Sequence, residues 1–186
     1  MTNPETLMPE THRSADEHSS AEPPAAGQSV ADHYGRPASE LRGFTGVMAV
    51  YAAGVSAALL AMKRAGRLPA GFGIADLALA TLATHKVSRT ISRDSVTSPL
   101  RAPFARFEGA AGPGEVQEKV AASGAQKSVG ELITCPFCLD QWVATGFIAG
   151  LAVAPRVTRF VASIFAVRAG ADLIQFGYAA AEQATE

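Results

Sequence analysis

Four long apolar runs dominate the pattern of hydrophobic and polar positions along this chain. They cover residues 44–62, 72–92, 136–154 and 157–180. The first run carries no charge, and at about 1.5 Å per residue it spans most of a bilayer's hydrocarbon core. The alternative is the buried helix of a soluble Ala-rich bundle, but such a helix usually shows a polar face and this one has none. We therefore predict an all-α fold, a small integral membrane bundle of about four transmembrane helices.

The second run carries a polar stripe in its C-terminal half. Thr, His, Ser and Arg recur there at offsets of three and four, which places them on one helical face: Thr81, Thr84, His85, Ser88, Arg89 and Ser92. In a membrane such a stripe faces other helices, water or headgroups. It is either a helix end reaching into the interface or the wall of a polar site, with His85 and Arg89 as members.

The third run begins at a cysteine pair, Cys135 and Cys138. Pro136 suits the first helical position, since its missing N–H would be unpaired there. Cys135 is then the cap, where unpaired N–H groups and the helix dipole favour a thiolate. Further along, Gly146 and Gly150 form a Gly-x-x-x-Gly pair, which favours close helix packing.

The fourth run contains two opposite charges one turn apart, Arg168 and Asp172. A charge inside a membrane costs a few kcal/mol, so it usually faces the bundle interior with a partner. We expect these two residues to form an intramembrane pair that locks the bundle. A transport or proton path is the alternative.

The remaining segments are polar. Residues 1–42 are rich in Thr, Ser, Glu, Pro and Ala, which predicts a disordered tail ahead of a membrane domain at 43–181. A long loop is expected at 94–131, where Pro99 and Pro103 disfavour a regular helix. Residues 115–127 are predicted to form a short surface helix in that loop.

Topology brings the polar residues of two helices together. The end of the second helix and the start of the third lie on the same membrane face, because one loop joins them. We therefore expect a polar rim beside the cysteine pair and His85, made of Arg89, Arg93, Asp94, Arg101 and Asp140.

Composition excludes several classes of protein. The chain has 186 residues, of which 48% are hydrophobic and 18% charged, and its net charge of −1 gives no case for nucleic acid as a partner. Its two cysteines cannot build a secreted disulfide framework. No signal peptide is expected. Basic residues near the helix ends lean weakly towards a multi-pass protein of the cell membrane with cytoplasmic termini and long loop.

Three motifs give the chain a family resemblance over about residues 74–180. They are T-H-x-x-S-R and T-S-P-L-R, within LATHKVSRTISRDSVTSPLRAPFARFEG, and C-P-F-C-x-x-x-W, within GELITCPFCLDQWVA. The chain resembles the bacterial membrane-protein family called domain of unknown function 1360. The resemblance implies an integral membrane protein without an established activity, and some members are linked to sporulation.

Several functions remain open from the residues. A scaffold or interaction protein is favoured, with the lipid bilayer and a second copy or another membrane protein as partners, because no complete catalytic set is present. The alternatives are a thiol redox protein using C-P-F-C, or a zinc site with Cys135, Cys138 and His85, for which a fourth ligand would be needed. Lipid or phosphate binding by Arg89, Arg93 and Arg101 is a further possibility.

Overall fold

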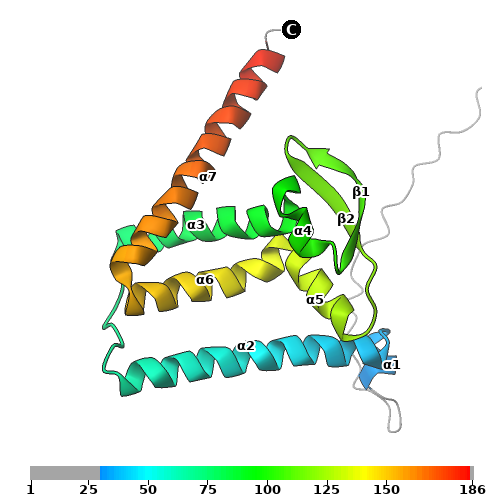
Figure 1. Cartoon of the computed structure of the whole chain (residues 1–186), viewed down its shortest axis with the longest axis horizontal. Helices are drawn as coiled ribbons and strands as arrows, with labels where there is room; N and C mark the ends of the chain where they lie inside the picture. Colours follow the sequence, from blue (N-terminus) through cyan, green and yellow to red (C-terminus); the bar gives the residue numbers. More distant parts are fainter. Residues whose placement is uncertain (1–29, 185–186) are drawn as a thin grey trace, which may run out of the picture.

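The computed structural model describes residues 30–184, which are mainly helical with one small sheet (Figure 1). The elements in chain order are α1 (Val30–Tyr34), α2 (Ala38–Arg64), α3 (Ile74–Arg93), η1 (Ser95–Thr97), α4 (Ser98–Arg101), β1 (Ala105–Gly112), β2 (Glu115–Val120), α5 (Ala125–Thr134), α6 (Pro136–Val153) and α7 (Pro155–Gln183).

The four long helices expected from the apolar runs are present as α2, α3, α6 and α7. Two of them, α2 and α6, are long and apolar enough to cross a membrane by length and composition. The predicted disordered tail is wrong at its C-terminal end, because α1 and the start of α2 occupy residues 30–34 and 38–42. Residues 1–29 of that tail lie outside the described part of the chain.

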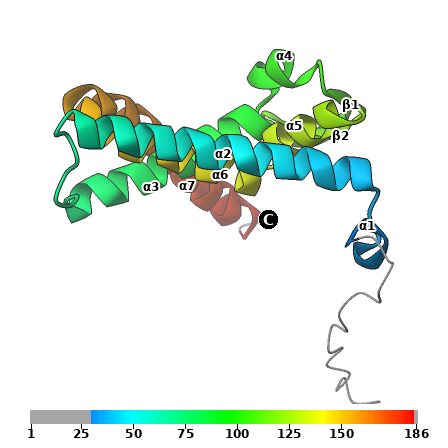
Figure 2. The same ribbon diagram turned by 90° about the horizontal axis from the view of Figure 1, so that it is seen from below.

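The central long helix is α3. It packs against α6 on one side and is crossed by α7 on another, whereas α2 contacts the remainder mainly through α5 (Figures 1 and 2). α2 and α6 run in the same direction, and α3, which lies between them in sequence, runs the opposite way; in space α6 lies between α2 and α3 (Figure 1). Residues 65–73 join the end of α2 to the start of α3, and the segment from η1 to α5 joins the end of α3 to the start of α6.

Small side chains form the contact between α3 and its neighbours. Ala80 and Ala83 of α3 are buried, as are Ala162 and Ala169 of α7. Leu151 is the only large apolar side chain that is buried among residues 30–184. Alanines let helix backbones approach closely, which is how helices pack inside membranes.

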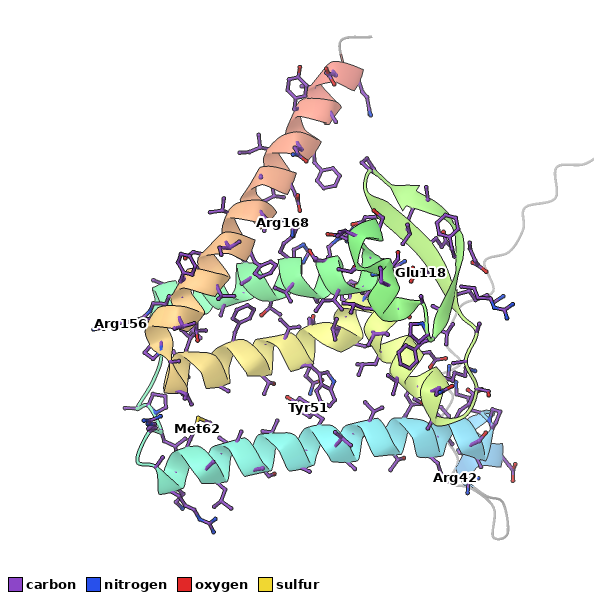
Figure 3. All side chains as sticks on the ribbon, viewed as in Figure 1. Arg42, Tyr51, Met62, Glu118, Arg156 and Arg168 are labelled. Atoms are coloured by element: carbon purple, nitrogen blue, oxygen red, sulfur yellow. The ribbon has the colours of Figure 1, made fainter. Side chains whose placement is uncertain are left out.

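Large apolar side chains are mostly exposed. α2 exposes Met48 and Val50, and α7 exposes Phe160, Ile174 and Phe176, each by more than 60%. Side chains project outward along the full length of both helices in Figure 3. An exposed apolar surface of this extent needs a covering, either lipid or another protein.

The segment predicted as a long loop is folded. β1 and β2 pair antiparallel, with Gly112 opposite Glu115, so the turn consists of Pro113 and Gly114. Gly114 has φ +75°, which a Pro-Gly turn of type II requires at its second central residue. The predicted surface helix over 115–127 is therefore wrong: its first half is β2 and only its end belongs to α5.

Arg101 joins the end of α3 to this hairpin. Its side chain is fully buried, and it forms a two-point ion pair with Glu118 of β2 at 2.6 and 3.2 Å. The remaining N–H groups donate to the carbonyl oxygens of Ile91 and Asp94 and to the hydroxyl of Thr97. Arg101 therefore does not offer its guanidinium to a lipid or phosphate, the further possibility raised by the sequence, because these acceptors enclose it.

Three ion pairs tie α7 to α3 or to the residue that follows it. Arg159 makes a two-point contact with Asp76, at 2.7 Å for both bonds. Asp172 pairs with the buried Lys86 at 2.5 Å, and Arg168 lies 3.6 Å from Asp94. The expected pair of Arg168 with Asp172 is therefore wrong, because crossing by α7 brings each of these residues to a closer partner.

The enclosure of Arg101 leads to a prediction about its replacement. Lysine is a point charge and cannot reproduce a fork of planar donors. We expect Arg101→Lys to lower the free energy of unfolding by about 2–4 kcal/mol, because buried carbonyls and Glu118 lose partners. Thermal unfolding of the detergent-purified protein measures this.

Arg106→Lys is the matched control, since Arg106 lies exposed on β1. It should change stability by less than about 0.5 kcal/mol. Equal melting temperatures for the two variants would contradict the structural role of Arg101.

Candidate functional site

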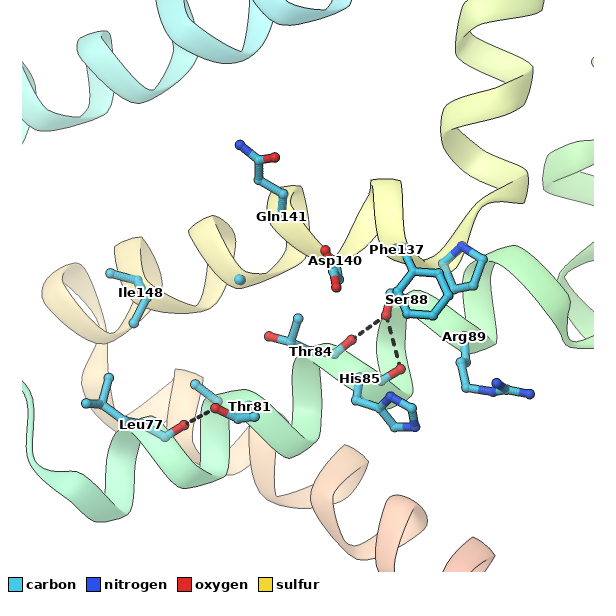
Figure 4. Close-up of a pocket in the computed structure, with 13 residues that line it drawn as sticks. Leu77, Thr81, Thr84, His85, Ser88, Arg89, Phe137, Asp140, Gln141 and Ile148 are labelled. Carbon is cyan, nitrogen blue, oxygen red and sulfur yellow. Dashed lines mark hydrogen bonds between the residues drawn. The ribbon is translucent and has the colours of Figure 1, made fainter. Parts of the chain in front are cut away.

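A groove of about 410 Å³ lies between α3 and α6. Figure 4 shows the two helices facing each other across it. The polar stripe predicted for the second helix supplies most of one wall. The lining residues are Leu77, Ala80, Thr81, Thr84, His85, Ser88 and Arg89 from α3, and Pro136, Phe137, Asp140, Gln141, Ala144 and Ile148 from α6.

The hydroxyl groups on the α3 wall are partly committed to their own helix. Thr81 Oγ1 donates to the carbonyl of Leu77 at 2.8 Å, and Ser88 Oγ donates to that of Thr84 at 2.7 Å. Such back-bonding satisfies polar atoms on a helix that faces apolar surroundings. It also leaves hydroxyl oxygens as acceptors, so this wall is polar but carries no net charge along most of its length.

The groove changes in character from one end to the other. Leu77 of α3 and Ile148 of α6 lie together at one end, and Arg89 and Phe137 lie at the other (Figure 4). Asp140 lies between, facing α3 from the first turns of α6. The groove is therefore apolar at the end near the α6–α7 junction and polar at the end near the hairpin and α5.

Charges at the polar end are unequally paired. Arg89 forms an ion pair with Glu115 of β2 at 2.5 Å, which fixes one of its terminal nitrogens. Among residues 30–184, the Asp140 carboxylate and the His85 ring have no ion-pair or hydrogen-bond partner. The polar end thus offers a carboxylate, an imidazole and the remaining donors of a guanidinium.

The structure brings together only part of the predicted rim. His85, Arg89 and Asp140 line the groove. Arg93 does not line it, and Asp94 lies with Arg168 instead. The first reading of the α3 stripe, a helix end that only meets the interface, does not account for the facing wall on α6.

Sequence reasoning missed Glu115 and Glu118, whose carboxylates hold Arg89 and Arg101. The available signal was the excess of arginine over acid in the predicted rim, which demands carboxylates from elsewhere in the chain. A second signal was the Pro113–Gly114 dipeptide, a strong turn marker between two short segments.

The two cysteines lie at the start of α6 but do not line the groove. Cys135 is the N-cap, as expected: its sulfur accepts a hydrogen bond from the Cys138 N–H at 3.2 Å. Cys138 is exposed and Cys135 half-buried. Within the part of the chain that the structure describes, no group of three or more His, Cys, Asp or Glu residues could hold a metal ion. His85 therefore does not join the cysteines in a ligand set there.

α6 is also fastened to α2, through an aromatic contact that the sequence did not predict. The ring of Tyr51 meets that of Trp142 edge to face, with centroids 5.0 Å apart. The Tyr51 hydroxyl bonds that of Thr145 at 2.8 Å, and in Figure 3 Tyr51 points from α2 towards α6. Of the Gly-x-x-x-Gly pair, Gly150 lies tightly against Thr158 of α7, while Gly146 has open space beside it.

These features define a class of protein: a mainly helical chain with two candidate membrane spans and a part-polar groove between two of its helices. The chain belongs to the family described as "Protein of unknown function (DUF1360)", whose profile matches residues 79–178. A curated relative, "Sporulation protein YjcA" of Bacillus subtilis, is 26% identical over 102 residues, which are 53% of this chain and 86% of the relative. No solved structure matches the chain.

The three motifs that carry the family resemblance meet at this site. T-H-x-x-S-R supplies Thr84, His85, Ser88 and Arg89 to one wall, and C-P-F-C supplies Pro136 and Phe137 to the other. T-S-P-L-R ends in Arg101, which secures the hairpin that holds Arg89 through Glu115. Two of the motifs therefore line the groove, and the third stabilises the hairpin beside it.

The N-cap role of Cys135 can be tested separately from any chemistry of its thiol. Serine is a strong N-cap residue, whereas alanine has no acceptor. We expect Cys135→Ser to retain stability and Cys135→Ala to lose about 0.5–1 kcal/mol, because the sulfur is a weak acceptor. Thermal unfolding compares the two variants.

The same pair of variants tests redox and metal chemistry, which both substitutions would abolish. Loss of bound zinc or of a reversible oxidation in Cys135→Ser at unchanged stability would support the chemical alternatives. A large loss of stability in Cys135→Ser would contradict the cap as the main structural role.

Proposed function

We propose that this protein is an integral membrane protein with four spans that acts as a small scaffold or interaction protein rather than an enzyme. The observation that carries the proposal is the exposed apolar surface on all four long helices, whereas the buried apolar side chains are almost all alanine. A soluble protein of this size buries its large apolar side chains. Lipid would cover the apolar side chains that the protein itself leaves exposed.

The direction of the helices supports more than two spans. α2 and α6, the two candidate spans, run the same way (Figure 1). If both cross the membrane in that direction, the chain between them must return, and α3 is the helix that runs back. α7 then begins where α6 ends and runs back towards the side on which α6 begins.

The charges on α3 and α7 are compatible with such spans because they are paired. Asp76 with Arg159 and Lys86 with Asp172 each sum to zero across the α3–α7 contact. Paired charges facing the interior of a bundle are the usual form of ionisable residues within membranes. The two helices therefore suit a membrane as a unit, although neither is apolar enough alone.

The biological setting and orientation are further parts of the proposal. The name of the Bacillus relative suggests a link to sporulation. Basic residues on the side of the hairpin, among them Arg36, Arg42 and Arg93, favour cytoplasmic placement of the hairpin and both termini. A second copy or another membrane protein is the expected partner of the exposed helix faces.

Topology is testable with single cysteines and a membrane-impermeant maleimide. In four spans, native Cys138 and a Leu68→Cys variant lie on opposite faces, and Gln183→Cys lies on the face of Cys138. With a cytoplasmic rim, Cys138 labels in inverted vesicles and Leu68→Cys in intact cells. Both new sites are placed in a chain whose native cysteines are serine.

Two outcomes would contradict the proposal. Labelling of Leu68→Cys and Cys138 from the same face would exclude α3 as a span. Release of the wild-type chain from membranes by alkaline carbonate would exclude integration itself.

The Lys86–Asp172 pair gives a second test. Lys86→Met leaves Asp172 without its partner, whereas Lys86→Met with Asp172→Leu removes both charges. We expect the single variant to lose about 2–4 kcal/mol of stability and the double variant to recover most of that loss. The melting temperature of the detergent-purified protein is the measurement.

Lys119→Met on the exposed side of β2 is the control and should be neutral. Equal losses in the single and double variants would show that the pair does not hold α7 on α3.

A further inference from the structure

The groove between α3 and α6 has the length of one bilayer leaflet. Its walls extend from residue 77 to 89 on α3 and from 136 to 148 on α6. At 1.5 Å per residue each wall is about 18 Å long. Half of a hydrocarbon core is about 15 Å. If these helices span the membrane as proposed above, the groove begins near the headgroup level beside the hairpin and runs inward along most of α3.

The polarity of the groove follows the same axis. Leu77, Ala80, Ala144 and Ile148 line the deep part, and the ionisable groups lie at the outer end. A volume of about 410 Å³ is within the range of sites that hold small molecules. An amphiphile with one extended chain and a polar head matches both the length and the gradient.

The outer end fits a head that carries both charges. The carboxylate of Asp140 has no cation partner among the described residues, so it would pair with a cation on the ligand. Arg89 keeps donors beyond the one held by Glu115, and His85 lies one turn away on the same wall; both suit a phosphate. A purely anionic head would meet Asp140 as a like charge.

The cation is better a primary ammonium than a quaternary one. Quaternary ammonium groups are recognised by cages of several aromatic rings. Phe137 is the only aromatic side chain that lines the groove within residues 30–184. A primary ammonium can instead donate hydrogen bonds to the carboxylate of Asp140.

We propose that the α3–α6 groove binds a phospholipid with a primary-amine, zwitterionic headgroup, such as phosphatidylethanolamine, from the adjoining leaflet. One acyl chain lies along the apolar part, the ammonium contacts Asp140, and the phosphate contacts Arg89 and His85. The inference rests on the proposed membrane integration, and it assigns the ligand class of the groove.

Native mass spectrometry of the full chain, purified in detergent, tests this inference. The probes are phosphatidylethanolamine, phosphatidylcholine and phosphatidylglycerol with identical chains, added singly and in equal mixture, and phosphoethanolamine without chains. We expect phosphatidylethanolamine to be retained about tenfold more than the other two lipids. Phosphoethanolamine should not be retained, because the groove holds the chain as well as the head.

Two pairs of variants locate the binding. Asp140→Asn should abolish the preference among lipids, while Glu108→Gln, which changes an exposed carboxylate on β1, should leave it intact. Ala144→Leu fills the groove and should reduce retention of every lipid about tenfold or more. Ala78→Leu, on an exposed position of α3 outside the groove, should not.

The outcomes separate this inference from the proposed function. Equal or greater retention of phosphatidylglycerol or phosphatidylcholine overturns it, as does retention that neither Asp140→Asn nor Ala144→Leu alters. A polypeptide that co-purifies and is lost only in Ala144→Leu would assign the groove to a partner helix instead. In each of these cases carbonate extraction still reports membrane integration independently.

Discussion

The buried guanidinium of Arg101 is the interaction on which the arrangement of the rim depends. It donates hydrogen bonds to the carbonyl oxygens of Ile91 and Asp94 at the end of α3, and it fixes β2 through the ion pair with Glu118. A buried charge is tolerated only when paired and fully hydrogen-bonded. The hairpin is therefore held in one position relative to α3, and Glu115 on the same strand is held beside Arg89.

The same hairpin also packs against α5, the helix that leads into α6. α5 continues from it, and Gly130 of α5 lies so close to Val120 and Phe104 that a side chain would collide with them. α5 also binds the start of α2, through Lys127 and Glu40 at 2.6 Å. The segment from η1 to α5 (residues 95–134) is thus a small folded cap that contacts α2, α3 and α6. The polar end of the α3–α6 groove lies next to this folded cap.

Away from the cap, the helices rely on alanine contacts and on ion pairs between α3 and α7. Alanine contacts bury little area, so they hold helices together only where water does not compete for the exposed apolar faces. The Lys86–Asp172 and Asp76–Arg159 pairs add directional attachment at two depths of α3. This combination agrees with the lipid surrounding proposed above.

The sequence by itself determined the local features. The four long helices follow from apolar runs, the start of α6 from Cys135 and Pro136, and the polar stripe of α3 from residues three and four apart, because each depends on neighbours within one or two turns. Partners were decided only by the tertiary structure. Arg168 and Asp172 are one turn apart, yet the crossing of α7 over α3 gives them Asp94 and Lys86. Arg101 became buried because Glu118, in a segment without a clear strand pattern, reaches it from a hairpin. Asp140 faces the α3 stripe because the folded cap places α6 opposite it, and no local pattern encodes the distance between two helices separated by that segment.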